Sequence, residues 1–275
     1  MALTLFHMER LIHLREAGFL ADSRSVVEMG AQQLANDFLR ARDRVDHLGR
    51  LFGVTTALEL PVPQRTPMVE GGIEHVPETA PLARSFWEWL EFEYASVDID
   101  GSPGSLPLDL NFDSVPDSAR KRFALVTNFG TTEHAANQLN AFKIIHDFTA
   151  PGGIMFHTVP AQGYFNHGLV NYNPKWFWML ARSNHYRWVY IDYTSAEHSS
   201  DFPANVVAEI MPYAPDIAER KDRYKHVDGG LVVVLQKVRD IEFVPPLDVA
   251  TGTKTTNKAL KERYWTVFGS SEDRR

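Results

Sequence analysis

The stretch Ser25-Val26-Val27-Glu28-Met29-Gly30-Ala31-Gln32 (SVVEMGAQ) decides the fold. A short, mostly apolar run of this kind is typical of a buried strand, and Gly30 closes it. The residues that follow, 33–51, have a helical pattern of apolar positions. A buried strand that leads through a glycine into a helix predicts the start of a doubly wound α/β sheet. In such sheets ligands bind beyond the carboxyl ends of the strands.

Apolar strands and helices continue to alternate along the rest of the chain. Further strands are predicted at residues 94–99, 106–110, 122–128, 154–159, 188–193 and 231–238. Further helices are predicted at residues 86–92, 134–148 and 174–184, with one or two amphipathic helices in residues 3–20. Near-continuous apolar strands that alternate with helices predict a mostly parallel sheet covered on both faces.

Prolines and glycines gather between the first two predicted strands. The segment contains Pro61, Pro63, Pro67, Pro77 and Pro81 and the pair Gly71-Gly72. These residues disfavour regular structure, so we predict an insertion or lid over residues 54–93 rather than a second domain. The chain then divides into a helical N-terminal segment (1–22), an α/β domain (23–240) and a polar tail (241–275).

Composition excludes several classes of protein. The net charge of the 275 residues is −7, and no stretch is strongly basic, which argues against nucleic acid as the main partner. No run of about 18 apolar residues exists to span a membrane. The absence of cysteine excludes disulfides and thiolate chemistry. Charges at Glu9, Arg10, Arg15 and Glu16 argue against a secretory signal, so we predict a soluble cytoplasmic protein.

Acidic side chains stand at the ends of the second and third predicted strands. Asp98 is placed to accept hydrogen bonds from a ribose diol, and Asp109 from an adenine amino group. Each aspartate has an alternative role as a helix cap or turn former. Three ligand-compatible residues at successive strand ends, with Gly30 the first, together favour a nucleotide-like ligand.

The motifs VVEMGA, SVDID, LPLDL, RFALVTNFGTTEH and PGGIMFHTVP, in this order, resemble those of class I S-adenosylmethionine-dependent methyltransferases over residues 23–240. The resemblance implies a Rossmann-like sheet with an antiparallel last strand, and S-adenosylmethionine as cofactor. It places Gly30 at the amino-acid moiety of the cofactor and Asp98 and Asp109 at its ribose and adenine. The cofactor-binding residues implied are Glu28, Gly30, Ala31, Gln32, Asp98, Ile99, Asp109, Leu110, Asn128, Phe129 and Gly130.

The sequence departs from the family pattern in its first motif. Gln32 and Leu34 replace the second and third glycines, and the interval from Glu28 to Asp98 is longer than the roughly 20 residues expected. The alternative function is therefore a non-catalytic binding or scaffold protein with a methyltransferase-like fold. A nicotinamide-dependent dehydrogenase is disfavoured, because no G-x-G-x-x-G follows the first strand.

Polar residues after the fourth and fifth strands are the candidates for chemistry on a small-molecule acceptor. Residues 163–173 are rich in His, Asn and Tyr, and we predict His167 as the acid–base group, with His134 and Glu133 as the other catalytic candidates. Glu133 and His134 could instead cap the next helix. We predict no metal, because these residues lack a metal-ligand spacing such as H-x-x-x-H. The identity of the acceptor and a homodimeric state are left open.

Overall fold

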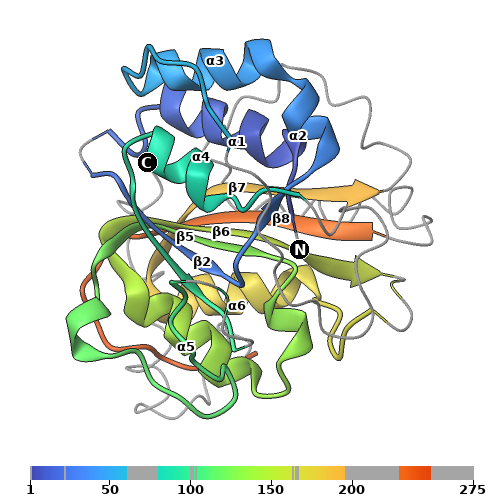
Figure 1. Cartoon of the computed structure of the whole chain (residues 1–275). Coiled ribbons are helices and arrows are strands. Elements are labelled where there is room, and N and C mark those ends of the chain that lie inside the picture. The colour runs from blue at the N-terminus through green and yellow to red at the C-terminus, as the bar shows by residue number, and fades with distance from the viewer. Residues whose placement is uncertain are drawn as a thin grey trace, which may run out of the picture.

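In the computed structural model, a six-stranded sheet runs through the centre of the molecule, with helices on both faces (Figure 1). The structure describes residues 2–21, 23–60, 80–99, 102, 104–162, 164, 167–195 and 229–248. The strands, in spatial order, are β4 (Glu93–Val97), β2 (Ser25–Met29), β5 (Phe123–Phe129), β6 (Thr149–Gln162), β8 (Gly229–Lys237) and β7 (Tyr186–Ser195). Among these strands β8 alone is antiparallel to its neighbours. The predicted Rossmann-like sheet, mostly parallel with an antiparallel last strand, is confirmed.

Side chains of each central strand alternate between two hydrophobic cores. Val26 packs into one core, and Val27 and Met29 into the other, because successive strand residues point to opposite faces. On the first face lie α1 (Leu5–Glu16), α2 (Asn36–Arg40), α3 (Arg42–Leu51) and α4 (Arg84–Trp89). On the second face lie α5 (Gln138–Phe148) and α6 (Pro174–Asn184) (Figure 1). Burial on both faces explains why the strands are apolar throughout.

The helix predicted over residues 33–51 begins later than expected. Gln33 and Leu34 form a short strand, β3, which pairs in parallel with β1 (Ala2–Leu3), and α2 starts only at Asn36. The backbone N–H of Leu34 also donates to Pro81 O at 2.8 Å. Residues 2–3 and Pro81, both distant in sequence, therefore hydrogen-bond to backbone groups of residues 33–34 that would otherwise bond within a helix.

The other corrections have equally local causes. The strand predicted at 106–110 is reduced to one bridge, between Leu106 and Val97, because Leu108 N, the next donor of a parallel ladder, turns back to Leu106 O at 2.9 Å. The helix predicted from residue 134 begins at Gln138, where the Asn137 side chain accepts a hydrogen bond from the backbone of Asn140. Ahead of it, the short 3-10 helix η2 (Thr132–His134) follows β5.

Part of the predicted insertion belongs to the core. Residues 80–93 include α4, whose Phe86 and Trp87 side chains are fully buried. Residues 61–79 of the insertion lie outside the described residues, as do residues 249–275 of the predicted tail.

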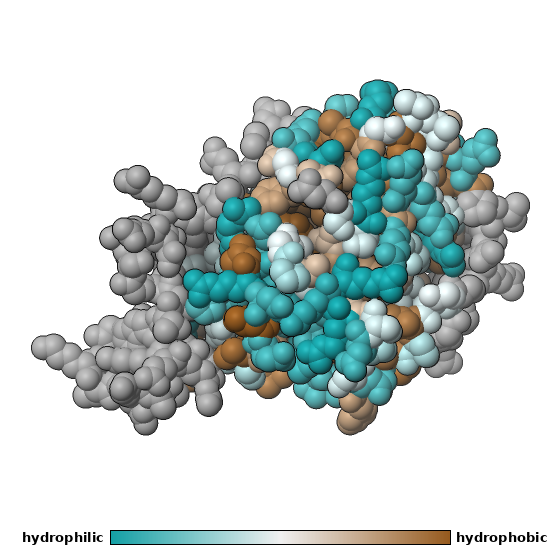
Figure 2. Space-filling model, turned by 90° about the vertical axis from the view of Figure 1, so that its left-hand side faces the viewer, coloured by the Kyte–Doolittle hydropathy of each residue, from teal (hydrophilic) through white to brown (hydrophobic). Residues whose placement is uncertain are grey.

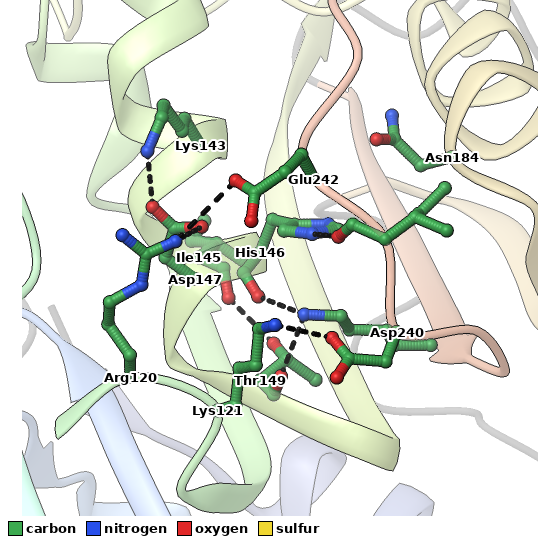
Figure 3. Close-up of polar contacts among 12 residues, drawn as sticks. Arg120, Lys121, Lys143, Ile145, His146, Asp147, Thr149, Asn184, Asp240 and Glu242 are labelled. Carbon is green, nitrogen blue, oxygen red and sulfur yellow. Dashed lines mark hydrogen bonds and ion pairs between the residues drawn. The ribbon is translucent and has the colours of Figure 1, made fainter. Parts of the chain in front are cut away.

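A buried lysine of β8, Lys237, joins the end of α5 to the sheet. The polar contacts around His146 and Thr149 at this end of α5 are shown in Figure 3. Lys237 Nζ donates to His146 O at 2.8 Å and to Thr149 O at 3.0 Å, and so satisfies carbonyls at the helix C-terminus. His146 Nε2 donates to Ile241 O at 2.8 Å, and Nδ1 accepts from Tyr186 Oη at 2.6 Å. Burial lowers the pKa of His146 to about 4 and that of Lys237 to about 8. These contacts hold β8 and Ile241 against the end of α5, while Val244 and Leu247 bond to Asn184 and Arg182 of α6.

The face at the amino-terminal ends of the parallel strands is largely hydrophilic (Figure 2). A cavity of about 580 Å³ opens there, lined in part by Gly18, Ala124 and Gly152. Ligands of doubly wound sheets bind at the opposite, carboxyl ends of the strands, so this cavity is remote from the predicted cofactor site. No helix in the described part of the chain is long and apolar enough to cross a membrane.

Candidate functional site

The carboxyl ends of β4, β2 and β5 lie side by side in the sheet. They bring together three predicted cofactor residues, Gly30, Asp98 and Asn128. Met29 is in register with Val97 on one side and with Asn128 on the other. Gly30 N donates to Val97 O at 2.7 Å, and Ala31 N donates to Asp98 Oδ2 at 2.9 Å. Gly30 and Gly130 have φ values near +78°, a conformation that favours glycine and turns the chain sharply off each strand.

Glu28 holds the loop after β2 from inside the protein. Its carboxylate is fully buried and accepts hydrogen bonds from Trp87 Nε1 at 2.7 Å, Tyr94 Oη at 2.8 Å and Gln32 N at 3.0 Å. Burial raises the pKa of Glu28 to about 7, and the three hydrogen bonds oppose that rise. The acidic residue of the first motif is therefore a support for the loop.

The backbone N–H groups of the loop Gly30–Gln32 are all hydrogen-bonded to other atoms of the protein. The N–H groups of Gly30, Ala31 and Gln32 donate to Val97 O, Asp98 Oδ2 and Glu28 Oε2, and so all three are used within the protein. The Gln32 side chain is buried, and its Nε2 donates to Met29 O at 3.3 Å and Gly30 O at 3.2 Å. The glutamine that replaces the second family glycine thus fills space beside the loop.

The residues present fit S-adenosylmethionine in part. Half-buried Asp98 lies beside the Gly30 loop, where a ribose diol is expected. One of its carboxylate oxygens, Oδ2, already accepts a hydrogen bond from Ala31 N. Asp109 Oδ1 accepts from Asn111 N at 2.8 Å, which is the turn-forming role given as its alternative. Ile99 is 67% exposed and Leu110 half-buried. Asp98 and Gly30 are the part of the set that suits the cofactor.

Asn128 lies near the end of β5 and supports the turn that follows the strand. It is fully buried, with its Nδ2 2.9 Å from Thr132 Oγ1 and 3.2 Å from His157 Nδ1, while its Oδ1 accepts from Thr132 N at 3.2 Å. Burial lowers the pKa of His157 to about 3, so this histidine is neutral at physiological pH. Asn128 and His157 shape the turn that carries Gly130 and Glu133.

A cavity of about 160 Å³ opens at the carboxyl ends of β5 and β6. It is lined by residues that include His7, Gly130, Glu133, Thr158, Tyr164 and His167. Two of the three predicted catalytic residues therefore face one cavity, next to Gly130 of the predicted cofactor set. The cavity is of a size for a small acceptor or for the reacting end of a larger one.

The three predicted catalytic residues lie together. His167 Nε2 is 3.5 Å from Glu133 Oε1, and the ring centroids of His134 and His167 are 5.2 Å apart. The Glu133 side chain is 1% exposed and the His167 side chain 41%. Partial burial lowers the pKa of His134, while the charge of Glu133 opposes the change. Neither Glu133 nor His134 caps α5, because Asn137 does so.

Backbone contacts fix this arrangement. Glu133 O accepts from Leu169 N at 2.8 Å and from Val170 N at 3.2 Å, so the segment after β6 is tied to η2. Gly168 allows the approach, since a Cβ there would lie 2.9 Å from Glu133 Cγ and 3.2 Å from Glu133 O.

Gly168→Ala is expected to push this segment away from η2. Overpacking of this kind destabilises proteins by about 1–3 kcal/mol. Denaturant unfolding of the variant measures the loss. Leu169→Ala is the matched control: this neighbouring side chain is 69% exposed, so its removal should change stability by no more than about 0.5 kcal/mol. Equal stabilities of the two variants would contradict the close approach.

Sequence reasoning missed His7 and Thr158. His7 Nδ1 accepts from Thr4 N at 3.1 Å, so Nε2 carries the ring proton and donates to Thr158 Oγ1 at 3.1 Å. The ring stacks on Phe129 at 3.9 Å, and burial lowers the pKa of His7 to about 3. The only signal in the sequence was the spacing of His7 midway between Leu3 and Leu11, on the apolar face of the predicted helix.

Comparisons with known proteins give one family match. Residues 63–204, more than half of the chain, match a family described as methyltransferase domain. No curated protein matches the sequence.

Among solved structures, the chain is similar to 1,6-didemethyltoxoflavin-N1-methyltransferase of Burkholderia thailandensis, with bound 1,6-didemethyltoxoflavin and S-adenosylhomocysteine (12% identity, 84% of this chain and 78% of that one, TM-score 0.43). It is also similar to the [4+2]-cyclase SpnF (12%, 83% and 80%, TM-score 0.40). A third similar structure is a SAM-dependent methyltransferase of Archaeoglobus fulgidus (9%, 83% and 94%, TM-score 0.39).

Proposed function

The chain belongs to the methyltransferase domain family, and we propose that it transfers a methyl group from S-adenosylmethionine to a small-molecule acceptor. The observation that carries the proposal is the arrangement at the carboxyl edge of the sheet. The Gly30 loop with Asp98 lies at β2 and β4, and the cavity with Glu133 and His167 lies at β5 and β6. Donor and acceptor sites are adjacent in this arrangement, as a direct displacement requires.

Gly30 and Asp98 are proposed to hold the cofactor. The positive φ of Gly30 lets the backbone approach a ligand, and Asp98 accepts from the ribose hydroxyls. When bound, the cofactor supplies an electrophilic sulfonium methyl group. Gly130 borders the acceptor cavity on the side of this loop, so the methyl group would enter there.

Glu133 and His167 are proposed to act on the acceptor. A hydroxyl or protonated amine must lose its proton to become a good nucleophile, and histidine titrates in the range suited to that transfer. The carboxylate of Glu133 lies 3.5 Å from His167 Nε2, so an acidic side chain stands beside the proposed base. His134 stands beside the pair as the second candidate base.

Calorimetric titration of the full chain with S-adenosylmethionine and S-adenosylhomocysteine tests the proposal. Saturable binding of both, with none of NAD, is expected for this family. Binding of NAD alone would support a dehydrogenase instead.

One observation favours the alternative of a non-catalytic binding or scaffold protein. The loop N–H groups are all used internally, and Gln32 fills the adjacent space. A chain that has lost cofactor binding would give no heat with either S-adenosyl compound. The same titration therefore separates the two functions.

Asp98→Ala is expected to weaken binding of S-adenosylmethionine by about 1–3 kcal/mol, the scale of hydrogen bonds that involve a charged group. Affinity is measured by calorimetry. Asp117→Asn is the control, because Asp117 is exposed in the 3-10 helix Asp117–Ala119, away from the loop. An affinity unchanged in Asp98→Ala would remove Asp98 from the site.

A further inference from the structure

Two histidines and one glutamate gather beside the acceptor cavity. One potential ligand atom from each of Glu133, His134 and His167 lies within 4.8 Å of the other two. Imidazole and carboxylate ligands together are typical of sites for Zn²⁺ and Fe²⁺. The sequence spacing predicted no metal, but spacing detects only ligands of one local segment. Here η2 supplies two residues and the segment after β6 supplies the third.

Glu133 provides the independent evidence for a ligand. Both of its carboxylate oxygens are buried, and neither has a hydrogen-bond partner among the described residues. A buried carboxylate without partners is costly, and such a group in a folded protein calls for an explanation. His167 Nε2, at 3.5 Å from Oε1, lies beyond a normal hydrogen bond. A divalent cation would satisfy this carboxylate directly.

The geometry suits a cation after small movements. Ligands of a tetrahedral zinc ion lie about 3.4 Å from one another, given bonds of about 2.1 Å. The Glu133 and His167 atoms are already 3.5 Å apart. His134 and His167 are both exposed, so their rings have room to rotate inward, while Glu133 is held by backbone bonds to Leu169 and Val170.

We propose that Glu133, His134 and His167 bind one divalent transition-metal cation, and that its open coordination positions bind a hydroxyl oxygen of the acceptor. Glu133 and His167 line the cavity, so those positions face it. The inference rests on the proposed function and changes only how the acceptor loses its proton. The cation lowers the pKa of the bound hydroxyl, whose proton passes to solvent. The oxygen then forms a bond to the methyl carbon, while the carbon–sulfur bond breaks and its electron pair stays on sulfur.

Metal binding is tested with the full, untagged chain. The chain is treated with EDTA, dialysed, and titrated with ZnCl₂ in a calorimeter, and CoCl₂ is added separately to record the visible absorption of a coordinated ion. One ion per chain is expected. Glu133→Gln, His134→Gln and His167→Gln should each weaken zinc binding by about 10-fold or more. Because His134 is exposed, His134→Gln should keep the fold even if Glu133→Gln does not, and circular dichroism checks each variant.

His47→Gln is the matched control. His47 Nε2 of α3 lies 3.3 Å from Glu16 Oε1 of α1, and the described residues offer no third ligand to this partly exposed pair. This variant should bind zinc like the parent chain. An absence of saturable zinc binding would overturn the proposal, as would an equal effect of His47→Gln and His134→Gln.

Titration of the EDTA-treated chain with S-adenosylmethionine separates this inference from the proposed function. Cofactor binding without zinc binding would overturn the metal site and leave methyl transfer with His167 as base. Zinc binding that depends on Glu133, His134 and His167 would support the metal site even where the cofactor fails to bind. In that case the methyltransferase proposal alone is overturned.

Discussion

Replacing Glu28 with alanine is expected to lower the free energy of unfolding at pH 5 by about 3 kcal/mol or more. Trp87 Nε1, Tyr94 Oη and Gln32 N all donate to this one carboxyl group inside the protein. Its removal leaves two buried donors and the partly buried Tyr94 hydroxyl without their acceptor, and each buried unsatisfied group costs about 1–3 kcal/mol.

The effect of this substitution should depend on pH. Burial raises the pKa of Glu28 to about 7, above its unfolded value of 4.5, so the folded state binds the proton more tightly. The stability that this group contributes is therefore full below about pH 4.5 and is lost as pH rises to 7. The deficit of Glu28→Ala relative to the parent should shrink between pH 5 and pH 8, by about 1–3 kcal/mol.

Denaturant unfolding of both chains at pH 5 and pH 8 measures the two effects. Glu88→Ala is the control, because Glu88 forms an exposed ion pair with Arg84 on α4, and such pairs contribute about 0–1 kcal/mol. A deficit for Glu28→Ala as small as that of the control would mean that the three donors find other partners. A deficit that grows with pH would contradict the raised pKa.

The family resemblance and the fold could be predicted because they depend on local patterns. Because each parallel strand is buried on both faces, its sequence is a nearly continuous run of apolar residues. The helices between the strands separate these runs along the chain. The resemblance carried by the motifs implied a mostly parallel sheet with an antiparallel last strand, and β8 confirms it. Gly30, Asp98 and Asn128 come together because the carboxyl ends of parallel strands share one edge.

The details of the site depend on contacts between distant segments, which no local pattern records. Residues 33–34 became a strand because residues 2–3 were available as its partner. His7 reaches Thr158 across 151 positions of sequence, and Gly168 meets Glu133 through a loop contact. Gln32 was recognised as a departure from the family pattern, but its folding back onto Met29 O and Gly30 O required the structure.

The glutamine variant of His167 is expected to lower turnover by about 100-fold, the usual scale for loss of an acid–base group. His167 faces the acceptor cavity and approaches Glu133, whereas Asp98 and the Gly30 loop lie at the neighbouring strands. The affinity for S-adenosylmethionine should therefore stay within about 2-fold of the parent, because the change removes an interaction with the acceptor alone.

Turnover is measured as S-adenosylhomocysteine release with an acceptor found by screening hydroxylated small molecules, and affinity is measured by calorimetry. His47 belongs to α3 and pairs with Glu16, so His47→Gln should leave both turnover and cofactor affinity unchanged. Unchanged turnover with reduced stability would make His167 a structural residue and move the role to His134 or Glu133.

Treatment with EDTA distinguishes the two proposed roles of His167, as a general base or as a metal ligand. If the imidazole is the base, EDTA leaves the parent enzyme active, and if it is a metal ligand, EDTA reproduces the loss seen in the variant and added zinc restores only the parent.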